Sequence, residues 1–260
     1  MQVDGRDQTR YEQGPRRMKV RGPAPAVAIH AWLNGAEFDF LHAEARSDAY
    51  PVIHERAIVG VRAQYWLVVD FLFADAAHDY DQRFHLAPHA RGRTALCRRD
   101  DTIVCEAPNL WIAQAASSGL VAALDDGFVS ERYGERRAAP VARFHRHAAD
   151  AQFHALLVPH VGEPPKVHLR TLPVCCEDGP VRGAAQALSI RFGGGRDAFV
   201  DTWLVRSRAA RGVCRFGSFR ADGRFAMVRE DAYGTVLRVH ADPGGRLEEG
   251  GFPVSALEAP

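Results

Sequence analysis

Two histidines and one aspartate in the first third of the sequence have the types and spacing that could build a small reactive site. The segment His54-Glu55-Arg56 precedes a turn near Arg62, and the chain returns through an apolar run that ends at Asp70. A hairpin that is symmetric about Arg62 would place His54 and Asp70 opposite each other, with Cβ atoms about 5 Å apart. A neighbouring strand would then supply His85.

This group favours two kinds of chemistry and has one structural alternative. Two imidazoles and a carboxylate could hold a metal ion, or the carboxylate could orient one histidine for proton transfer. The alternative is a polar pair buried between sheets, because an aspartate in an apolar strand needs a partner whatever the function. We interpret His54, Asp70 and His85 as a structural polar cluster, and a metal-dependent enzyme centred on them remains an alternative hypothesis.

A second histidine group occurs in the middle of the chain. Residues i and i+2 of a strand share a face, so His145 and His147 could chelate one ion, with His154 nearby. The Ala148-Ala149-Asp150 segment that follows is typical of the exposed end of a hairpin. No carboxylate or thiolate stands at a defined spacing from these histidines, so we predict no metal site here.

The elements that must position these residues are predicted to be β-strands. Runs rich in Val, Leu, Phe and Tyr end at Gly, Pro or Asp about every 8–12 residues, the spacing of an all-β sandwich or barrel. Ser117-Ser118-Gly119 interrupts the best helical candidate, Ala113–Ala123, which we therefore interpret as strand, turn and strand. Asp125-Asp126-Gly127 and Ala221-Asp222-Gly223 predict hairpin turns.

The predicted strands are Ala36–Ala43, Val52–Gly60, Tyr65–Phe73, Tyr80–Leu86, Thr102–Glu106, Asn109–Ala115, Phe128–Arg132, Val141–His145, Gln152–Pro159, Val167–Pro173, Ala185–Phe192, Ala198–Val205, Val213–Phe219, Arg224–Val228 and Thr235–His240. The pattern predicts an all-β fold, an antiparallel β-sandwich of two packed sheet layers over residues 1–260. Gly162-Glu163-Pro164-Pro165 is interpreted as a turn or short linker. A soft boundary near residues 175–183 would separate a smaller rear sheet.

The five cysteines are an odd number and do not form a closed disulfide framework. Cys97 and Cys105 flank an Asp100-Asp101 turn, so they could face each other across a hairpin. We favour two reduced thiols over a bridge between them. The vicinal pair Cys175-Cys176 has poor geometry for a mutual disulfide and is too sparse for a zinc cluster.

Composition and charge exclude several classes of protein. The chain has 33 Lys plus Arg against 32 Asp plus Glu, a net charge of +1, which argues against a general nucleic-acid binder. At 47% hydrophobic and 25% charged residues, the composition is that of a folded globular protein. The richest apolar run, Tyr65 to Ala74, contains Asp70, so we expect no membrane span. The amino terminus lacks a basic segment followed by an apolar one, which taken literally predicts a cytoplasmic protein.

Four tryptophans could serve as stacking platforms for sugar rings in a carbohydrate-binding sandwich: Trp32, Trp66, Trp111 and Trp203. The apolar neighbours of Trp66 favour a core position for that side chain, which leaves Trp32, Trp111 and Trp203 as the candidates. A tryptophan exposed beside Arg and Asp in a groove would favour binding. Burial of all four would exclude it.

Several segments, in their order along the chain, point to one family. They are Val3-Asp4-Gly5-Arg6-Asp7-Gln8, Tyr50-Pro51-Val52, His54-Glu55-Arg56, Tyr65–Asp70, Gln82–Pro88, Asp126–Ser130, Arg132-Tyr133-Gly134, Ala139-Pro140-Val141, Leu156–Pro159, Ala221–Arg224, Val228-Arg229 and Tyr233-Gly234. Together they resemble the carboxy-terminal β-sheet region of the heparinase II/III-like polysaccharide lyases. The resemblance spans essentially the whole chain.

The resemblance implies a fold, a reaction and a location. Members of the family carry an amino-terminal α/α-toroid followed by antiparallel β-sheets. They cleave uronate-containing polysaccharides by β-elimination, in which a base removes the C5 proton and the C4 oxygen leaves. Tyr and His transfer the protons, an Asn or Glu polarises the carboxylate, and a zinc site uses His, Asp and a His in a His-Asn-Thr motif. A periplasmic or cell-envelope location is implied, and so is an acidic polysaccharide as partner.

The family's functional residues have no matching positions in this sequence. The His-Asn-Thr motif directly precedes the Val-Asp-Gly element, which here is Val3-Asp4-Gly5. We therefore expect the catalytic residues, the zinc ligands and a signal peptide to lie amino-terminal to Met1, together with a toroid domain in the same or a split chain. Zinc is expected only with that part. The prediction is the carboxy-terminal portion of a polysaccharide lyase, inactive as an isolated chain, and the alternative is a non-catalytic carbohydrate-binding module. If the chain is complete, it is cytoplasmic.

Overall fold

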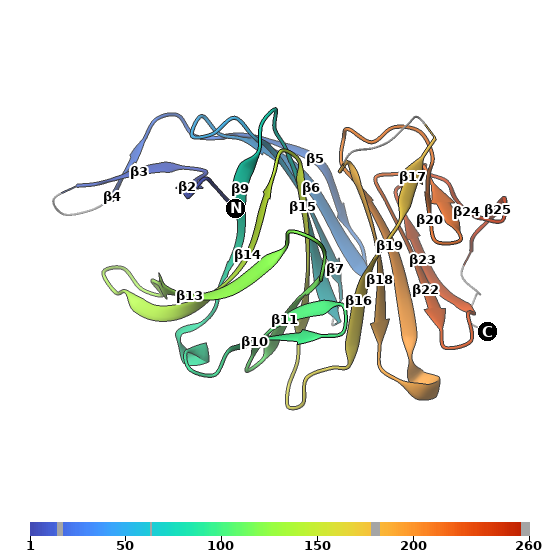
Figure 1. The fold of residues 1–260 in the computed structure, drawn as a ribbon. Helices are drawn as coiled ribbons and strands as arrows, with labels where there is room; N and C mark the ends of the chain where they lie inside the picture. The colour runs from blue at the N-terminus through green and yellow to red at the C-terminus, as the bar shows by residue number, and fades with distance from the viewer. Residues whose placement is uncertain (15–17, 63, 178–182, 256–260) are drawn as a thin grey trace. The chain divides into compact units, whose positions relative to one another are not determined.

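The fold is all-β, as the sequence predicted. The computed structural model describes residues 1–14, 18–62, 64–177 and 183–255. These residues form antiparallel β-strands and two short 3-10 turns, Pro88–Ala90 and Gly195–Asp197, and contain no α-helix (Figure 1). Nothing in this part of the chain is a helix able to span a membrane.

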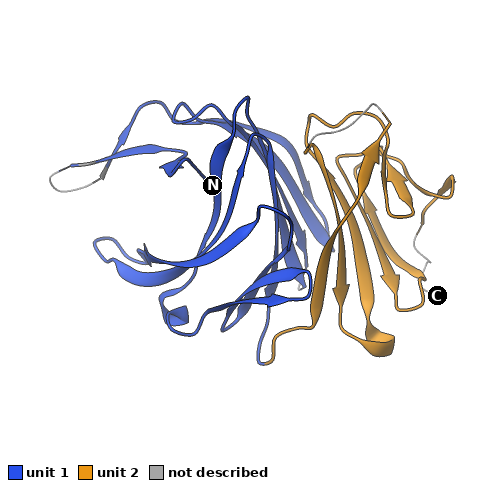
Figure 2. Cartoon of the chain, viewed as in Figure 1, with its two compact units in different colours: residues 1–162 blue, residues 163–260 orange. Residues whose placement is uncertain are grey.

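The chain divides into two compact units, Met1–Gly162 and Glu163–Pro260 (Figure 2). The division falls within the Gly162-Glu163-Pro164-Pro165 segment that the sequence analysis interpreted as a turn or linker. The soft boundary predicted near residues 175–183 lies inside the second unit, and residues 178–182 of it are outside the described residues.

The first unit contains an eight-stranded sheet in the order β10-β11-β12-β15-β8-β7-β6-β5. Its strands are β5 (Ala26–Asn34), β6 (Phe38–Arg46), β7 (Ile53–Val61), β8 (Tyr65–Phe73), β10 (Ala95–Arg99), β11 (Thr102–Ala107), β12 (Leu110–Ala115) and β15 (Ala151–Pro159). The central strand β8 has the predicted bounds, and it is apolar on both faces apart from Asp70.

A five-stranded sheet in the order β13-β14-β9-β1-β2 forms the second layer of this unit. Its strands are β1 (Gln2–Val3), β2 (Arg6–Asp7), β9 (His78–His85), β13 (Val121–Val129) and β14 (Arg137–Ala148). A separate hairpin pairs β3 (Arg10–Gln13) with β4 (Met18–Arg21).

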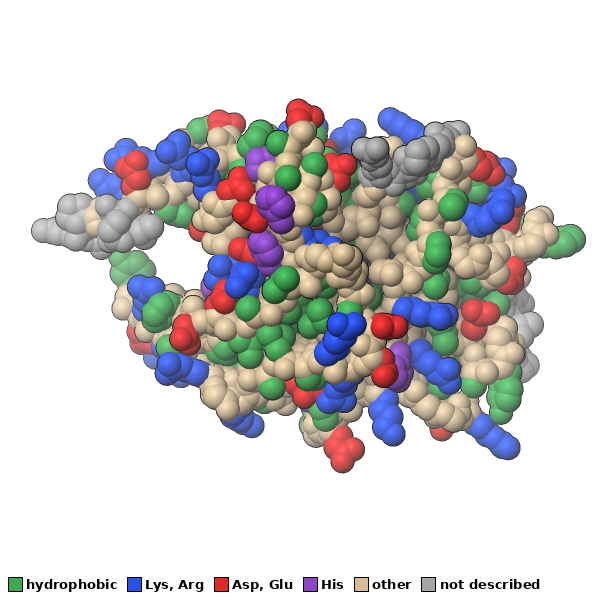
Figure 3. Space-filling model, in the orientation of Figure 1, with side chains coloured by type: hydrophobic (Ala, Val, Ile, Leu, Met, Phe, Trp, Pro, Cys, Tyr) green, Lys and Arg blue, Asp and Glu red, His purple; other side chains and the backbone are tan. Residues whose placement is uncertain are grey.

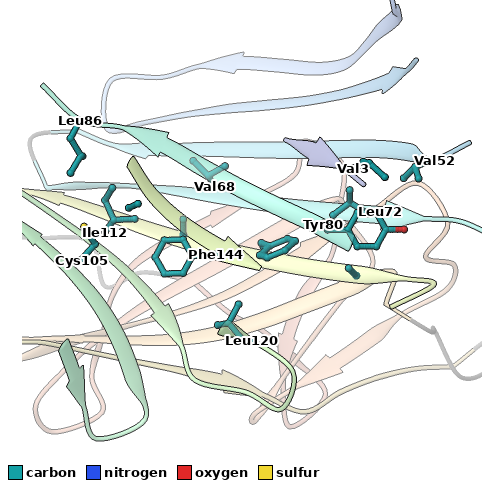
Figure 4. Packing of buried hydrophobic residues seen from close by; sticks show 14 of the residues in the cluster. Val3, Val52, Val68, Leu72, Tyr80, Leu86, Cys105, Ile112, Leu120 and Phe144 are labelled. Carbon is teal, nitrogen blue, oxygen red and sulfur yellow. The ribbon is translucent and has the colours of Figure 1, made fainter. Parts of the chain in front are cut away.

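Side chains from both sheets of the first unit share one hydrophobic core. Tyr80 on β9 and Phe144 on β14 lie with Leu72 on β8 and Ile112 on β12, all of them fully buried (Figure 4). Alternate residues of each strand point to one face, which places these four side chains between the layers. The first unit is therefore a two-layer antiparallel sandwich.

The second unit has two five-stranded sheets, ordered β16-β18-β19-β22-β23 and β17-β20-β21-β24-β25. The strands are β16 (Val167–Leu172), β17 (Val174–Cys176), β18 (Ala185–Phe192), β19 (Phe199–Arg206), β20 (Cys214–Phe216), β21 (Phe219–Ala221), β22 (Phe225–Asp231), β23 (Val236–Ala241), β24 (Leu247–Glu249) and β25 (Phe252–Pro253). Leu204 and Val228 from one sheet and Phe216 and Phe219 from the other share a core.

A disulfide joins Cys176 on β17 to Cys214 on β20, two residues that face each other in the strand register. The sequence did not predict this bond, because Cys176 was interpreted only together with its neighbour Cys175, which is an exposed free thiol. Cys97 and Cys105 are also free. The idea that they face each other is wrong, because the register pairs Cys97 with Val104 and Cys105 with Leu96.

Two turn predictions had different outcomes. Asp125-Asp126-Gly127 is not a turn but the middle of β13, where each residue pairs with β14. The long ladder between these strands overrides the local Asp-Gly preference. Ala113–Ala123 does divide into strand, turn and strand, as predicted, with β12 ending at Ala115 and β13 starting at Val121.

Candidate functional site

Asp70 lies at the centre of a buried polar network between the two sheets of the first unit. Its side chain is fully buried, and Arg56 contacts it through two hydrogen bonds, Nε to Oδ1 at 2.6 Å and Nη2 to Oδ2 at 2.9 Å. His54 Nε2 lies 2.7 Å from Oδ1. The predicted contact of His54 with Asp70 is therefore present, but the predicted register is wrong. Arg56 stands opposite Asp70, and His54 stands opposite Leu72.

Two glutamines extend this network, one from each sheet. Gln82 on β9 donates from Nε2 to Asp70 Oδ2 at 2.7 Å. Gln114 on β12 donates from Nε2 to Gln82 Oε1, also at 2.7 Å. His85 is exposed on β9. It lies an odd number of residues from the inward-facing Gln82 and so points to the opposite face of the strand, which keeps it away from Asp70.

The charge of Asp70 is strongly stabilised inside the sandwich. Burial by itself would raise the pKa of this carboxyl, but Arg56 and His54 outweigh burial and hold the pKa well below its usual range. Asp70 in turn raises the pKa of Arg56. A permanently ionised carboxylate whose oxygens are occupied by Arg56, His54 and Gln82 suits a structural role better than proton transfer.

The outward-facing side chains of β9 and β14 form a second polar group, which we call the polar face: Asp79, Asp81, Arg83, Arg143, His145 and His147. Each histidine stands directly opposite an aspartate in the strand register. His147 Nδ1 lies 3.0 Å from Asp79 Oδ1, and His145 Nδ1 lies 3.0 Å from Asp81 Oδ1. Figure 3 shows histidine, acidic and basic side chains gathered over these strands.

Two arginines stand directly opposite each other in the middle of the polar face. Arg83 pairs with Arg143 in the register of β9 and β14. Arg143 donates from Nε to Asp125 Oδ2 at 2.8 Å, and this hydrogen bond raises the pKa of Arg143. Like charges placed opposite each other on a sheet are destabilising. Asp125 Oδ2 lies 2.8 Å from Arg143 Nε and 3.7 Å from Arg83 Nη2, so one carboxylate bridges the two guanidinium groups on this part-exposed surface.

A pocket of about 560 Å³ adjoins the polar face. Its lining residues are Arg6, Asp7, Thr9, Arg10, Tyr11, Asp48 and Ala49. Gln2 connects the two regions, because its Nε2 donates to Asp7 Oδ1 at 2.7 Å and its Oε1 accepts from Arg83 Nη1 at 2.9 Å. The volume lies within the range of small-molecule sites.

The histidines do not form a metal centre with each other. Within the described ranges, no three His, Cys, Asp or Glu side chains are grouped so that they could hold a metal ion. His154 lies apart from His145 and His147, because it is buried on β15 and accepts a hydrogen bond from the Ala115 amide.

The four tryptophans divide into a buried and an exposed pair. Trp111 and Trp203 are almost fully buried, so they cannot be the stacking platforms that the sequence suggested. Trp66, expected in the core, is 49% exposed, and Trp32 is 68% exposed. Arg56, Gln82, Arg83 and Arg143 were not singled out from the sequence. The available signal is a spacing of two residues along a strand, which places side chains on the same face. Arg56 is spaced in this way from His54, Arg83 from Asp81 and Arg143 from His145.

Comparison with known proteins agrees with this architecture. A family model described as "Heparinase II/III-like, C-terminal" matches residues 1–155, which are almost the whole first unit, whereas the resemblance was expected to span the chain. A search of curated proteins gives no match.

Among solved structures, the heparan sulfate lyase HepC from Pedobacter heparinus is similar with a TM-score of 0.54 and 17% identity, over 71% of this chain and 28% of that one. A heparinase III, the BT4657 gene product, is similar with a TM-score of 0.51 and 14% identity, over 66% of this chain and 27% of that one. The chain spans little more than a quarter of these structures, and at such identity the likeness shows the fold alone. Because the family model covers more than half of its residues, the chain belongs to the heparinase II/III-like family.

Proposed function

We propose that this chain is the β-sandwich portion of a polysaccharide lyase that acts by β-elimination on uronate-containing polysaccharides, and that its polar face holds the polyanion. Membership of the heparinase II/III-like family supports a lyase. The observation that carries the role of the polar face is the opposed pair Arg83 and Arg143. A carboxylate or sulfate of the polysaccharide would take the place that the Asp125 carboxylate holds between the two guanidinium groups.

The imidazoles beside the arginine pair suit the same ligand. His145 and His147 are each held through Nδ1 by an aspartate, which orients the ring and leaves Nε2 of the more exposed His147 facing solvent. An imidazole held in this way can donate a hydrogen bond to a sugar hydroxyl or to a carboxylate. The pocket lined by Arg6, Arg10 and Tyr11 offers further donors for the same chain of sugars.

The chain alone is proposed to bind without cleaving. In the family, the proton-transfer Tyr and His and the zinc ligands lie in regions to which no residue of this sequence corresponds. The similar solved structures are more than three times as long as the part that this chain matches, which supports a contribution from an additional domain, the toroid. The proposed substrates are heparin-like, alginate-like or other uronate polysaccharides.

An oxidising compartment, the periplasm or cell envelope, is proposed as the location. The family resemblance supports it, and so does the Cys176–Cys214 disulfide, because such bonds form and persist outside the reducing cytoplasm.

The test combines a binding measurement with an activity measurement on the purified 260-residue chain. Heparan sulfate and alginate are titrated calorimetrically, and the ultraviolet absorbance of unsaturated uronate is followed in the same mixtures. The expected result is binding without product. The double variant Arg83→Ala/Arg143→Ala should bind at least about tenfold more weakly, since hydrogen bonds to charged groups contribute about 1.5–3 kcal/mol.

The matched control is Arg170→Ala/Arg215→Ala, which removes the same charge from exposed sites in the second unit. Its affinity should equal that of the parent chain. A clear rise in absorbance would contradict the inactivity of the isolated chain. Equal loss of affinity in both double variants would show that only net charge matters, and would exclude the polar face as the site. Another outcome is that the chain binds the polysaccharide and still gives no cleavage after a toroid domain is supplied. That result would favour the alternative, a non-catalytic carbohydrate-binding module.

A further inference from the structure

A second surface of the first unit has the features of a sugar-binding subsite, and it lies on the other sheet. Four residues form one row across β5, β6, β7 and β8: Asn34, Asp39, Gly60 and Trp66. The row points to the same face of the sheet as Asp70, because Trp66 and Asp70 are separated by an even number of residues on β8.

Asp39 is held so that one of its carboxylate oxygens remains available. Oδ1 accepts a hydrogen bond from Asn34 Nδ2 at 2.7 Å and another from Arg62 Nη2 at 3.1 Å. Arg62 is itself fixed, because its Nε donates to the Gly35 carbonyl at 2.9 Å. Among the described residues, no side chain or backbone group bonds to Oδ2, and the side chain is 42% exposed. Asp39 is therefore a pre-oriented hydrogen-bond acceptor.

The indole of Trp66 lies beside this acceptor because Gly60 has no side chain. A Cβ at Gly60 would stand 3.2 Å from both Cδ1 and Nε1 of Trp66, and 3.9 Å from Asp39 Oδ2. The ring thus lies against the Gly60 backbone, with its Nε1 donor and the Asp39 acceptor near the same point. Trp66 as a whole residue remains 49% exposed.

Trp32 extends the surface along the edge strand. It lies two residues from Asn34 on β5 and is 68% exposed. The row through Trp32 continues with Leu41, Ile58 and Val68, and it passes into the hydrophobic core of the first unit, because Val68 is buried there and Ile58 packs against that core. The surface therefore combines two exposed indoles and one polar corner.

We infer that this surface binds a neutral pyranose segment of a glycan, with Trp66 and Trp32 stacking on sugar rings and Asp39 accepting a hydroxyl hydrogen bond. The C–H face of a pyranose is apolar and fits the face of an indole, while its equatorial hydroxyls need acceptors at the ring edge. A neutral sugar suits this corner, because the ion pair of Asp39 with Arg62 carries no net charge that would attract a uronate or a sulfate. Trp32, Trp66 and Asp39 are thus assigned to a different ligand chemistry from Arg83 and Arg143.

The second surface goes beyond the role proposed for the polar face and can succeed or fail independently of it. Binding to the polar face depends on charge and must weaken in salt. Stacking on tryptophan is nearly insensitive to salt. Raising the ionic strength from about 0.01 M to about 1 M shortens the Debye length from about 30 Å to about 3 Å, which separates the two kinds of binding.

The experiment titrates neutral β-1,4-linked hexasaccharides of glucose, mannose and xylose into the 260-residue chain, with heparan sulfate as the charged comparison. Tryptophan fluorescence and calorimetry report binding at both ionic strengths. The variants are Trp66→Ala, Trp32→Ala and Asp39→Ala. The control is Phe128→Ala on the other sheet, because Phe128 is 48% exposed and so matches Trp66.

The expected result is that at least one neutral hexasaccharide binds equally well at both ionic strengths. Trp66→Ala and Asp39→Ala should each weaken it about tenfold or more, and Phe128→Ala should not. Heparan sulfate binding should be unchanged in these variants. The inference is overturned if no neutral hexasaccharide binds, or if the three variants bind as the parent chain does. It is also overturned if sedimentation shows a dimer that Trp32→Ala disperses, because a second copy would then occupy the surface. Thermal unfolding confirms that each variant is folded, as expected for exposed side chains.

Discussion

Gln82 on β9 donates a hydrogen bond to Asp70 on β8 across 2.7 Å, and so joins the two sheets of the first unit through their shared interior. Arg56, His54 and Gln114 complete the same buried network. The residues that most resemble a catalytic cluster in the sequence therefore act as a connection between layers. The side chains available to a ligand lie on the polar face and around Trp66.

Replacing Asp70 with Asn should strongly destabilise the first unit. The substitution removes the buried carboxylate that accepts hydrogen bonds from Arg56 and Gln82, and the loss of such charged hydrogen bonds costs about 1.5–3 kcal/mol, because the Arg56 side chain itself is 36% exposed. Urea unfolding followed by circular dichroism measures the change. Asp126→Asn is the control, because Asp126 is exposed on β13, and it should change the free energy of unfolding by less than about 0.5 kcal/mol. Equal stability of the two variants would contradict the role of the network.

The stabilisation by Asp70 should disappear in acid. Its pKa in the folded chain lies below the unfolded value of about 3.9, so its contribution is complete above that pH and is lost as the pH falls towards the folded pKa. The difference in unfolding free energy between the parent chain and Asp70→Asn should therefore shrink between about pH 4 and about pH 2. A difference that stays constant over this interval would show that the charge of Asp70 does not stabilise the fold.

Removing the Cys176–Cys214 disulfide should destabilise the second unit by about 2–4 kcal/mol. The bond closes a segment with a sequence separation of 38 residues, and so restricts the unfolded chain. The double variant Cys176→Ser/Cys214→Ser is compared with Cys175→Ser, in which the neighbouring exposed thiol is replaced. A reducing agent should lower the Tm of the parent chain and of Cys175→Ser. The prediction fails if the double variant responds to the reductant as the parent does.

Gly60→Ala should displace the Trp66 indole while the sheet stays intact. The new Cβ would stand 3.2 Å from two ring atoms, which is too close for undisturbed contact, and the ring is free to move into solvent. We expect a changed tryptophan emission spectrum and weaker binding of neutral hexasaccharide, with a circular dichroism spectrum like that of the parent. An unchanged emission spectrum would mean that the position of the Trp66 indole does not depend on the missing side chain at Gly60.

The sequence predicted the strands well where an apolar run is bounded by turn residues. β8 and β18 have the predicted bounds because Val, Leu and Phe favour a buried pleated surface whatever the partner strand. β5 was missed, although it carries Trp32. Its side chains at Val27, Ile29 and Trp32 are exposed, because β5 is an edge strand. Hydrogen bonds to its one neighbouring strand stabilise it, rather than burial of its side chains.

Register and exposure could not be predicted from the sequence. A shift of two residues in the β7–β8 hairpin brings Arg56 rather than His54 opposite Asp70, and the turn geometry that sets this shift leaves no clear pattern in the residues. Trp66 lies in an apolar run, yet its row ends in Gly60, Asp39 and Asn34, so the ring is half exposed. The opposed arginines Arg83 and Arg143 become neighbours only through the pairing of β9 with β14.

The most direct test of the account is the affinity of the chain for heparan sulfate, measured for the parent and for Arg83→Ala/Arg143→Ala at about 0.05 M and about 0.2 M salt. We expect that the parent binds, that its affinity falls as salt rises, and that the double variant binds at least about tenfold more weakly with a smaller dependence on salt. Equal affinity and equal salt dependence of the two proteins would contradict the assignment of the polar face to an acidic polysaccharide.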